Sequence, residues 1–425
     1  MEAKKGLAAS EVLLTLGFIA FFIPASYAIP GIVFKLWEYY YMAVAIVAVG
    51  VLALKHINDI NPRYVLLVVY FTWLFFGTQL IVTTRSLAMM TLIKKYLKCV
   101  GFVSMLELGF LSFKKQEVVK SFLNAGLIMS FLHFVTFLIY GRTEGGMRHG
   151  QAFYNGYALI GNTKQNWYLL TYDNESIFYF LPILALLLYC TWYLNRKTKK
   201  LFYLYLGILL FMFIYKTAAT AMLGTIGFTV LILYYVAKMK RKRKRRKYEI
   251  SSFLNYTTAV LGGLTVDIAV VMLAGSKIAT KVAGYFGKDA DFSGREYIWA
   301  NSFKFIRMQP LTGVGMESSE RITLKLNQTH CHNIIVENLY TGGVIALVLF
   351  LLILWFFRPK AKKSFAVIIF AAALATFFVI SGLDWLIANP IPWALFYFCY
   401  YLSDAEESVW VFLTRRLGLF KKVNI

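Results

Sequence analysis

The densest group of chemically capable residues in this sequence is His330-Cys331-His332-Asn333, followed by Glu337. It stands directly before an apolar run, in a chain that has five histidines in all. An imidazole titrates near neutral pH and can accept a proton from a sugar hydroxyl, which is the interpretation we favour. The histidines could instead cap the membrane segment without a chemical role. They could also bind a metal, but the sequence shows no suitably spaced partner ligands.

Basic residues accompany the histidines in the segments that we place on the same side of the membrane. Guanidinium and ammonium groups bind phosphate oxygens, and arginine does so with a forked geometry. A phosphate held at a bilayer surface is most simply attached to a lipid. The candidates for this phosphate site are Arg148, Arg295, Arg307, Arg321, Lys216 and Lys304.

The composition indicates an all-α polytopic membrane protein. The chain is 59% hydrophobic and 16% charged, whereas ordinary soluble domains carry about 25% charged residues. Apolar stretches of about 20 residues predict about 12 transmembrane helices. No cleavable signal is expected, because the first stretch lacks a small-residue cleavage site. The predicted spans lie near 10–30, 37–54, 63–83, 88–112, 117–140, 174–194, 200–218, 220–237, 252–275, 333–357, 364–382 and 391–403.

Membrane topology explains most of the net charge of +24. Basic residues recur in alternate connections, so the positive-inside rule predicts an even number of spans with both termini in the cytoplasm. The polybasic loop 238–251 and the amphipathic tail 404–425 are then cytoplasmic. The loop is expected to contact anionic membrane lipids. It does not predict nucleic-acid binding, because no aromatic or groove-reading element is interleaved with its charges.

Two long loops fall on the extracytoplasmic side of this single membrane domain, 1–425. They are 141–173 and 276–331, and loops of such length are usually functional. Within the second loop, 293–310 predicts an amphipathic helix, with a capping box of Ser293 and Glu296 and a stop at Pro310. The turn 311–316 follows. Its glycines permit sharp backbone geometry, but it lacks the context of a dinucleotide-binding fingerprint.

The order of these motifs resembles the O-antigen ligase and polymerase family of bacterial membrane glycosyltransferases. In that family a long outer loop carries an arginine, a tryptophan and a Pro-Leu-x-Gly-x-Gly turn, before His-Asn opens a span. Here the pattern is found over about 295–355. The matching residues are Arg295, Trp299, Pro310-Leu311-Thr312-Gly313-Val314-Gly315, His332-Asn333, Glu337 and Gly342-Gly343.

The resemblance implies a GT-C-like fold and a transfer of glycan from an undecaprenyl-pyrophosphate carrier to an acceptor sugar hydroxyl, at the outer face of the bacterial cytoplasmic membrane. It implies no metal and no other cofactor. Arg295 would stabilise the leaving pyrophosphate, and His332 would orient or deprotonate the acceptor while Glu337 holds its imidazole. Trp299, Tyr154 and Trp167 are candidates for stacking on sugar rings.

One position departs from the family pattern. A Ser-Arg pair is often found at the outer start of an earlier span, where this chain has Ala218-Ala219, and Lys216 is a candidate substitute for the missing charge. Arg148 resembles more loosely the basic residue of the family's other outer loop.

We favour a repeat-unit polymerase over a ligase that moves the glycan to a terminal acceptor, because no soluble acceptor-binding domain is attached. A lipid-linked glycan flippase is the alternative from another class. It is disfavoured because the sequence shows no internal repeat. The partners implied are the lipid-linked oligosaccharide donor and the glycan acceptor, with a chain-length regulator and a flippase of the same pathway as further candidates.

Overall fold

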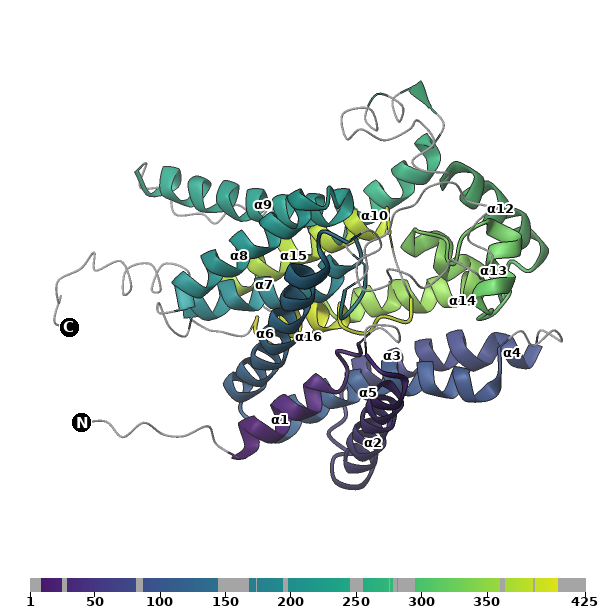
Figure 1. The fold of residues 1–425 in the computed structure, drawn as a ribbon, viewed down its shortest axis with the longest axis horizontal. Coiled ribbons are helices and arrows are strands. Elements are labelled where there is room, and N and C mark those ends of the chain that lie inside the picture. Colours follow the sequence, from purple (N-terminus) through teal and green to yellow (C-terminus); the bar gives the residue numbers. More distant parts are fainter. Residues whose placement is uncertain are drawn as a thin grey trace.

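The computed structural model describes residues 9–24, 29–81, 87–143, 168–172, 174–193, 198–244, 255–274, 276–277, 281, 295–359, 364–384 and 387–403. The regular structure in these ranges is helical, which confirms the predicted all-α class. Figure 1 shows the arrangement of the helices. Their bounds are α1 (Ala9–Ile19), α2 (Gly31–Lys55), α3 (Pro62–Thr72), the π-helical turn η1 (Trp73–Gly77), α4 (Thr78–Ile81), α5 (Met89–Ser112), α6 (Lys115–Tyr140), α7 (Ser176–Tyr193), α8 (Thr198–Tyr215), α9 (Ala219–Lys244), α10 (Tyr256–Leu273), α12 (Arg295–Met308), α13 (Ser319–Leu326), α14 (Ile334–Phe356), α15 (Phe365–Ser381) and α16 (Trp393–Tyr401).

Seven helices of the described chain are long and apolar enough to cross a membrane, and three apolar helices are shorter. The seven are α2, α6, α7, α8, α9, α10 and α14. The polytopic prediction is therefore confirmed, whereas the predicted number of about 12 spans is not. The difference has physical reasons: α5 carries lysines and a glutamate, the predicted span 63–83 is divided among α3, η1 and α4, and α16 has nine residues.

The predicted loops are described in part. Residues 141–143 and 168–172 of the first outer loop are placed, and the tail 404–425 lies outside the described residues. Helix α9 continues through Lys244, so it extends past the predicted end of its span at 237 into the polybasic segment.

Helix α15 forms the centre of one half of the bundle. It packs against α7, α9, α10 and α16, and nearly all of its side chains are buried. The peripheral helices instead leave large apolar side chains uncovered; on α2, for example, Leu36, Ile46 and Leu54 are more than half exposed. Such faces are normal where lipid is the solvent. The buried α15 thus provides a fixed support for the connection that follows it.

Helices α12 and α13 lie together at one end of the bundle, beside α14 (Figure 1). The predicted amphipathic helix is thereby confirmed as α12, although the capping residue Ser293 lies outside the described residues. Its buried residues Ile298, Trp299 and Ile306 form a second, smaller core with residues of α14. The apolar face of α12 therefore packs on protein.

Helix α14 is broken in its first half, and the preceding turn fills the break. Gly343 has φ 65° and ψ −163°, a conformation that is not helical. The backbone of the turn binds on both sides of it: Val314 N donates to Tyr340 O (2.7 Å), and Val344 N donates to Pro310 O (2.8 Å). The turn thus satisfies backbone groups that a continuous helix would have satisfied within itself. This connection fixes α12 to the start of α14.

We predict that Gly343→Ala destabilises the protein. A Cβ at this residue would lie 2.2 Å from the carbonyl oxygen of Leu311, and its backbone conformation is one that only glycine adopts readily. The strain alone should cost about 1–3 kcal/mol, which thermal unfolding in detergent would show as a lower melting temperature.

The matched control is Gly262→Ala in α10, where a Cβ would meet nothing within 4 Å. A helix-interior glycine replaced by alanine should be neutral or stabilising, by up to about 1 kcal/mol. Equal melting temperatures for the two variants would contradict the assigned break.

Candidate active site

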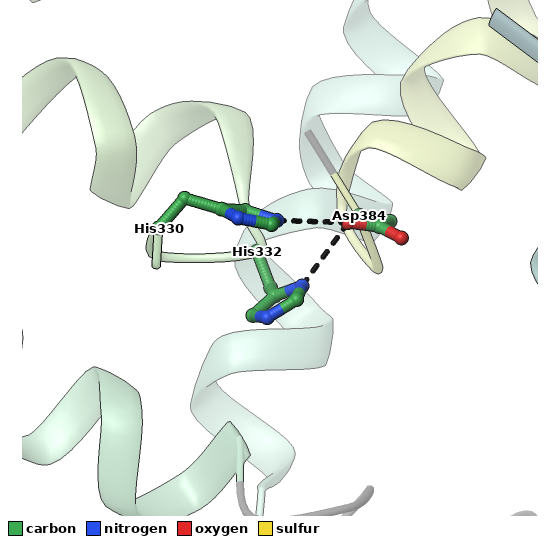
Figure 2. A group of neighbouring side chains, drawn as sticks. All are labelled: His330, His332 and Asp384. Atoms are coloured by element: carbon green, nitrogen blue, oxygen red, sulfur yellow. Dashed lines mark hydrogen bonds and ion pairs between the residues drawn. The ribbon is translucent and has the colours of Figure 1, made fainter. Parts of the chain in front are cut away.

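A buried carboxylate, Asp384, holds the two histidines of the predicted site. His330 Nε2 and His332 Nδ1 both contact its Oδ1 oxygen, at 3.0 and 3.1 Å, as Figure 2 shows. Tyr172 donates its hydroxyl to the other oxygen, Oδ2, at 2.7 Å. Asp384 follows α15, the histidines precede α14, and Tyr172 precedes α7. One charge therefore joins three segments that are distant in the sequence.

The segment before α7 contributes a second acidic group. Thr171 Oγ1 donates to Glu175 Oε2 at 2.6 Å, and Glu175 is buried just before α7. Burial and the nearby charge of Asp384 raise the pKa of Glu175 to about 7. This carboxyl can therefore exchange a proton near neutral pH.

The backbone around His332 is positioned by its neighbours. His332 has φ 53°, in the left-handed region that non-glycine residues rarely occupy, where strain costs about 1–3 kcal/mol. The next residue, Asn333, caps α14: its side-chain oxygen accepts from Ile335 N and Val336 N, and its amide donates to the carbonyls of Asp267 and Gly382. The cap also ties the start of α14 to the end of α15. These contacts hold His332 in its strained conformation.

Cys331, between the histidines, is held on both sides. Trp299 Nε1 of α12 donates to its carbonyl at 2.8 Å, and its amide donates to Glu337 Oε2 at 2.7 Å. All four cysteines are free. The backbone of Cys331 is therefore fixed, and it fixes the backbone of the histidines on either side of it.

The surroundings shift the pKa values of the two histidines in opposite directions. Burial opposes ionisation of Asp384, but the hydrogen bonds from His330 and His332 outweigh it and hold the Asp384 pKa well below its usual value. Burial likewise opposes protonation of His330, yet its hydrogen bond with Asp384 and the negative charge of that group raise the His330 pKa. The surroundings therefore favour a protonated His330 beside an ionised Asp384.

The pKa of His332, in contrast, is lowered. Burial and the adjacent charge of His330 lower the His332 pKa to about 3, and the charge of Arg295 contributes in the same direction. A neutral His332 that donates through Nδ1 to Asp384 has an unprotonated Nε2. This is the tautomer in which an imidazole can accept a proton from a hydroxyl group.

The same three side chains could hold a metal ion. One donor atom from each of His330, His332 and Asp384 can be chosen so that all lie within 4.8 Å of one another. Two imidazoles and a carboxylate are ligands that zinc accepts. The sequence did not suggest this set because the third ligand lies 52 residues after His332.

The structure brings some of the predicted residues together and separates others. Arg295 acts electrostatically on His332 and on Tyr172. Arg321, in contrast, pairs with Glu317 at 3.1 Å.

The other predicted cations have separate surroundings. Lys304 donates to Asn301 at 2.9 Å and Arg307 is exposed. Lys216 lies over the ring of Tyr215, 5.6 Å from its centre. Arg148, Tyr154 and Trp167 lie outside the described residues.

Two expected roles are corrected by the geometry. Glu337 does not hold the imidazole of His332; it accepts from the Cys331 amide, and Asp384 takes the orienting role. Trp299 is 2% exposed and its indole NH is bound to the Cys331 carbonyl, so it supports the site and offers no open face to a sugar.

Three residues of the candidate site could not be predicted from the sequence: Asp384, Glu175 and Tyr172. All are polar residues immediately next to apolar runs. Asp384 in 381-SGLDW-385 follows the α15 run, and Tyr172 and Glu175 in 171-TYDNE-175 precede the α7 run. An acid at a membrane boundary is a signal for function, but the sequence does not show which boundaries meet.

Two comparisons with known proteins match parts of this chain. Residues 168–351 match the family model described as O-antigen ligase. The match begins just before Tyr172 and Glu175 and includes Arg295, both histidines and the broken part of α14. Asp384 lies beyond it.

The chain is also similar to the exopolysaccharide production protein ExoQ of Rhizobium meliloti (strain 1021), with 28% identity over 109 residues. The similarity covers 23% of this chain and 24% of that protein. The chain thus matches about a quarter of the length of this relative.

We predict that Asp384→Ala costs about 3–5 kcal/mol of folding stability, because it leaves the buried His330 charge without a partner. Tyr172→Phe, which removes one hydrogen bond to a charged group, should cost about 1.5–3 kcal/mol. Thermal unfolding of the purified variants measures both. Asp384→Ala with the wild-type melting temperature would contradict the ion pair.

Proposed function

From the match of residues 168–351 to the family model described as O-antigen ligase, we propose that the protein is a membrane glycosyltransferase that polymerises a polysaccharide. It takes a glycan from an undecaprenyl-pyrophosphate carrier and transfers it to a sugar hydroxyl of an acceptor, at the outer face of the cytoplasmic membrane. The observation that carries the proposal is the Asp384–His332 pair, with Arg295 in electrostatic range, beside a broken membrane helix.

The proposed reaction uses the two residues for opposite purposes. The bond between the anomeric carbon and the phosphate oxygen breaks, and the acceptor oxygen forms the new glycosidic bond. The proton of the acceptor hydroxyl passes to Nε2 of His332, while Asp384 orients the ring and stabilises the imidazolium. The carrier diphosphate takes the bonding electrons, and Arg295 stabilises its growing negative charge.

The low pKa of His332 is compatible with this role. Among the causes that lower it are the charges of His330 and Arg295. A bound diphosphate would bring negative charge to the same place and raise the pKa towards that of a useful base. Substrate binding would thereby activate the base.

The alternative within the family is a ligase that moves the finished glycan to a terminal acceptor. The favoured polymerase and this ligase require the same chemistry, so they differ in their acceptors. Analysis of glycans from a deletion strain separates them. Single carrier-linked repeats support the polymerase, and long carrier-linked chains that do not reach the surface support the ligase.

We predict that His332→Ala in the complemented deletion strain abolishes the high-molecular-weight polysaccharide while the protein level is unchanged. Loss of a general base should lower the rate by about 10²–10⁴. Gel analysis of the polysaccharide and a blot of the membrane fraction give the two readouts. The control is His56→Ala, whose ring contacts Ser112 away from the site. Normal polymer length with His332→Ala would remove this residue from the reaction.

The proposed mechanism is independent of metal, which leads to a second prediction. EDTA should leave the transfer rate of the purified enzyme unchanged, and added Zn²⁺ should inhibit it by occupying His330, His332 and Asp384. Release of radiolabelled carrier diphosphate measures the rate. Loss of activity with EDTA and recovery with a divalent ion would show instead that these side chains hold an essential metal.

A further inference from the structure

Helix α5 carries three lysines near its start, and they fall into two groups. Lys94 forms an ion pair with Glu38 of α2 at 2.7 Å. Lys95 and Lys98 are half-buried and three residues apart, so they are neighbours on the helix surface. In the described part of the chain neither of them forms a hydrogen bond or an ion pair. Uncompensated cations in a membrane protein are costly and typically mark the path of a substrate.

These two lysines are within electrostatic range of carboxylates of the candidate active site. Lys95 interacts electrostatically with Glu337, and Lys98 with Glu175. Next to Lys98, the Cys99 thiol contacts the carbonyl of Ala388 at 3.6 Å, in the connection that also contains Asp384. Helix α5 therefore packs against the connection that contains Asp384.

The charges around the site leave an excess of positive charge among the described residues. The basic groups are Lys95, Lys98, Arg295 and His330, and the acidic groups are Glu175, Glu337 and Asp384. Glu337 and Asp384 already accept hydrogen bonds from the Cys331 amide and from the histidines. An anionic ligand would balance the two lysines.

We propose that Lys95 and Lys98 bind the diphosphate of the lipid-linked donor together with Arg295. The inference rests on the proposed function, because it assigns the group that holds the carrier during transfer. A lysine ammonium is a compact charge on a flexible stem, so it can follow phosphate oxygens as the bond to the sugar breaks. Arg295 belongs to the second outer loop, whereas the lysines belong to a membrane helix. The carrier would thus contact both parts of the site.

Binding of undecaprenyl diphosphate to the full-length protein in nanodiscs of uncharged lipid tests the proposal. The double variant Lys95→Gln/Lys98→Gln should bind it at least about a hundredfold more weakly than the wild type, since each charge-assisted hydrogen bond corresponds to about tenfold or more in affinity. Lys95→Arg/Lys98→Arg should retain most of the affinity, and the matched control Lys94→Gln should retain all of it.

Further ligands distinguish the lipid carrier from a free anion. Undecaprenyl monophosphate should bind more weakly than the diphosphate, and undecaprenol should show no difference between wild type and variant. Inorganic pyrophosphate should compete only at much higher concentration; competition at equal concentration would assign the lysines to a soluble anion and overturn the proposal.

Stability gives a readout that does not depend on activity. Lys95→Met/Lys98→Met should raise the melting temperature of the ligand-free protein, because it removes two uncompensated charges; a lower melting temperature would indicate structural lysines and contradict the proposal. Equal binding of undecaprenyl diphosphate by wild type and Lys95→Gln/Lys98→Gln would overturn this inference alone. A wild type that binds no undecaprenyl diphosphate would overturn the proposed function as well.

Discussion

The arrangement at the membrane boundary depends on one buried charge, the carboxylate of Asp384. An ionised carboxylate withdrawn from water is costly unless it is paired and fully hydrogen-bonded. Here the donors are His330, His332 and Tyr172, and each comes from a segment outside α15. The need to satisfy this charge therefore brings the segments before α7 and α14 and the connection after α15 to one place. Stability and the geometry of the site have the same origin.

The break in helix α14 is the second constraint. It fixes the start of α14, and therefore the orientation of the histidines that precede it. The turn 310–315 binds to the backbone on both sides of Gly343, and the indole NH of Trp73 donates to Gly342 O at 2.9 Å. The start of α14 is thereby fixed to α12 and to the π-helical turn η1. In a membrane, irregular backbone is tolerated where protein satisfies it, and such positions are commonly functional. The break separates a short polar segment with Asn333 and Glu337 from the apolar remainder.

Much of this architecture could be predicted because it depends on local sequence. Long apolar runs identified the membrane helices, and the capping pattern and apolar spacing identified α12. His332 and Arg295 were found because they stand in a recognisable order along one loop. The predicted number of spans failed where local apolarity is a poor guide: α5 carries four charged residues, and α16 has nine residues.

The partner of His332 could not be predicted for the same physical reason. Glu337 is close in sequence and was expected to orient the imidazole, but its position on the first turn of α14 directs it to the Cys331 amide. Asp384 is 52 residues away and reaches His332 only because α15 packs beside α10 and Asn333 ties α14 to the end of α15. Such a contact is set by helix packing, which periodicity does not encode.

The electrostatics of the site follow from its place at the boundary between water and bilayer. In water, Lys95, Lys98 and Arg295 would be solvated and would attract a diphosphate weakly, because the solvent screens each charge. Half-buried cations are less well solvated, so the folded protein is less stable without an anion and binds an anion more strongly when it arrives. Cations that are already fixed in position do not have to reorganise when the leaving diphosphate gains negative charge. Such preorganised charges lower the activation barrier of the transfer reaction. The cost in stability and the benefit to the transfer reaction are thus two consequences of the same burial.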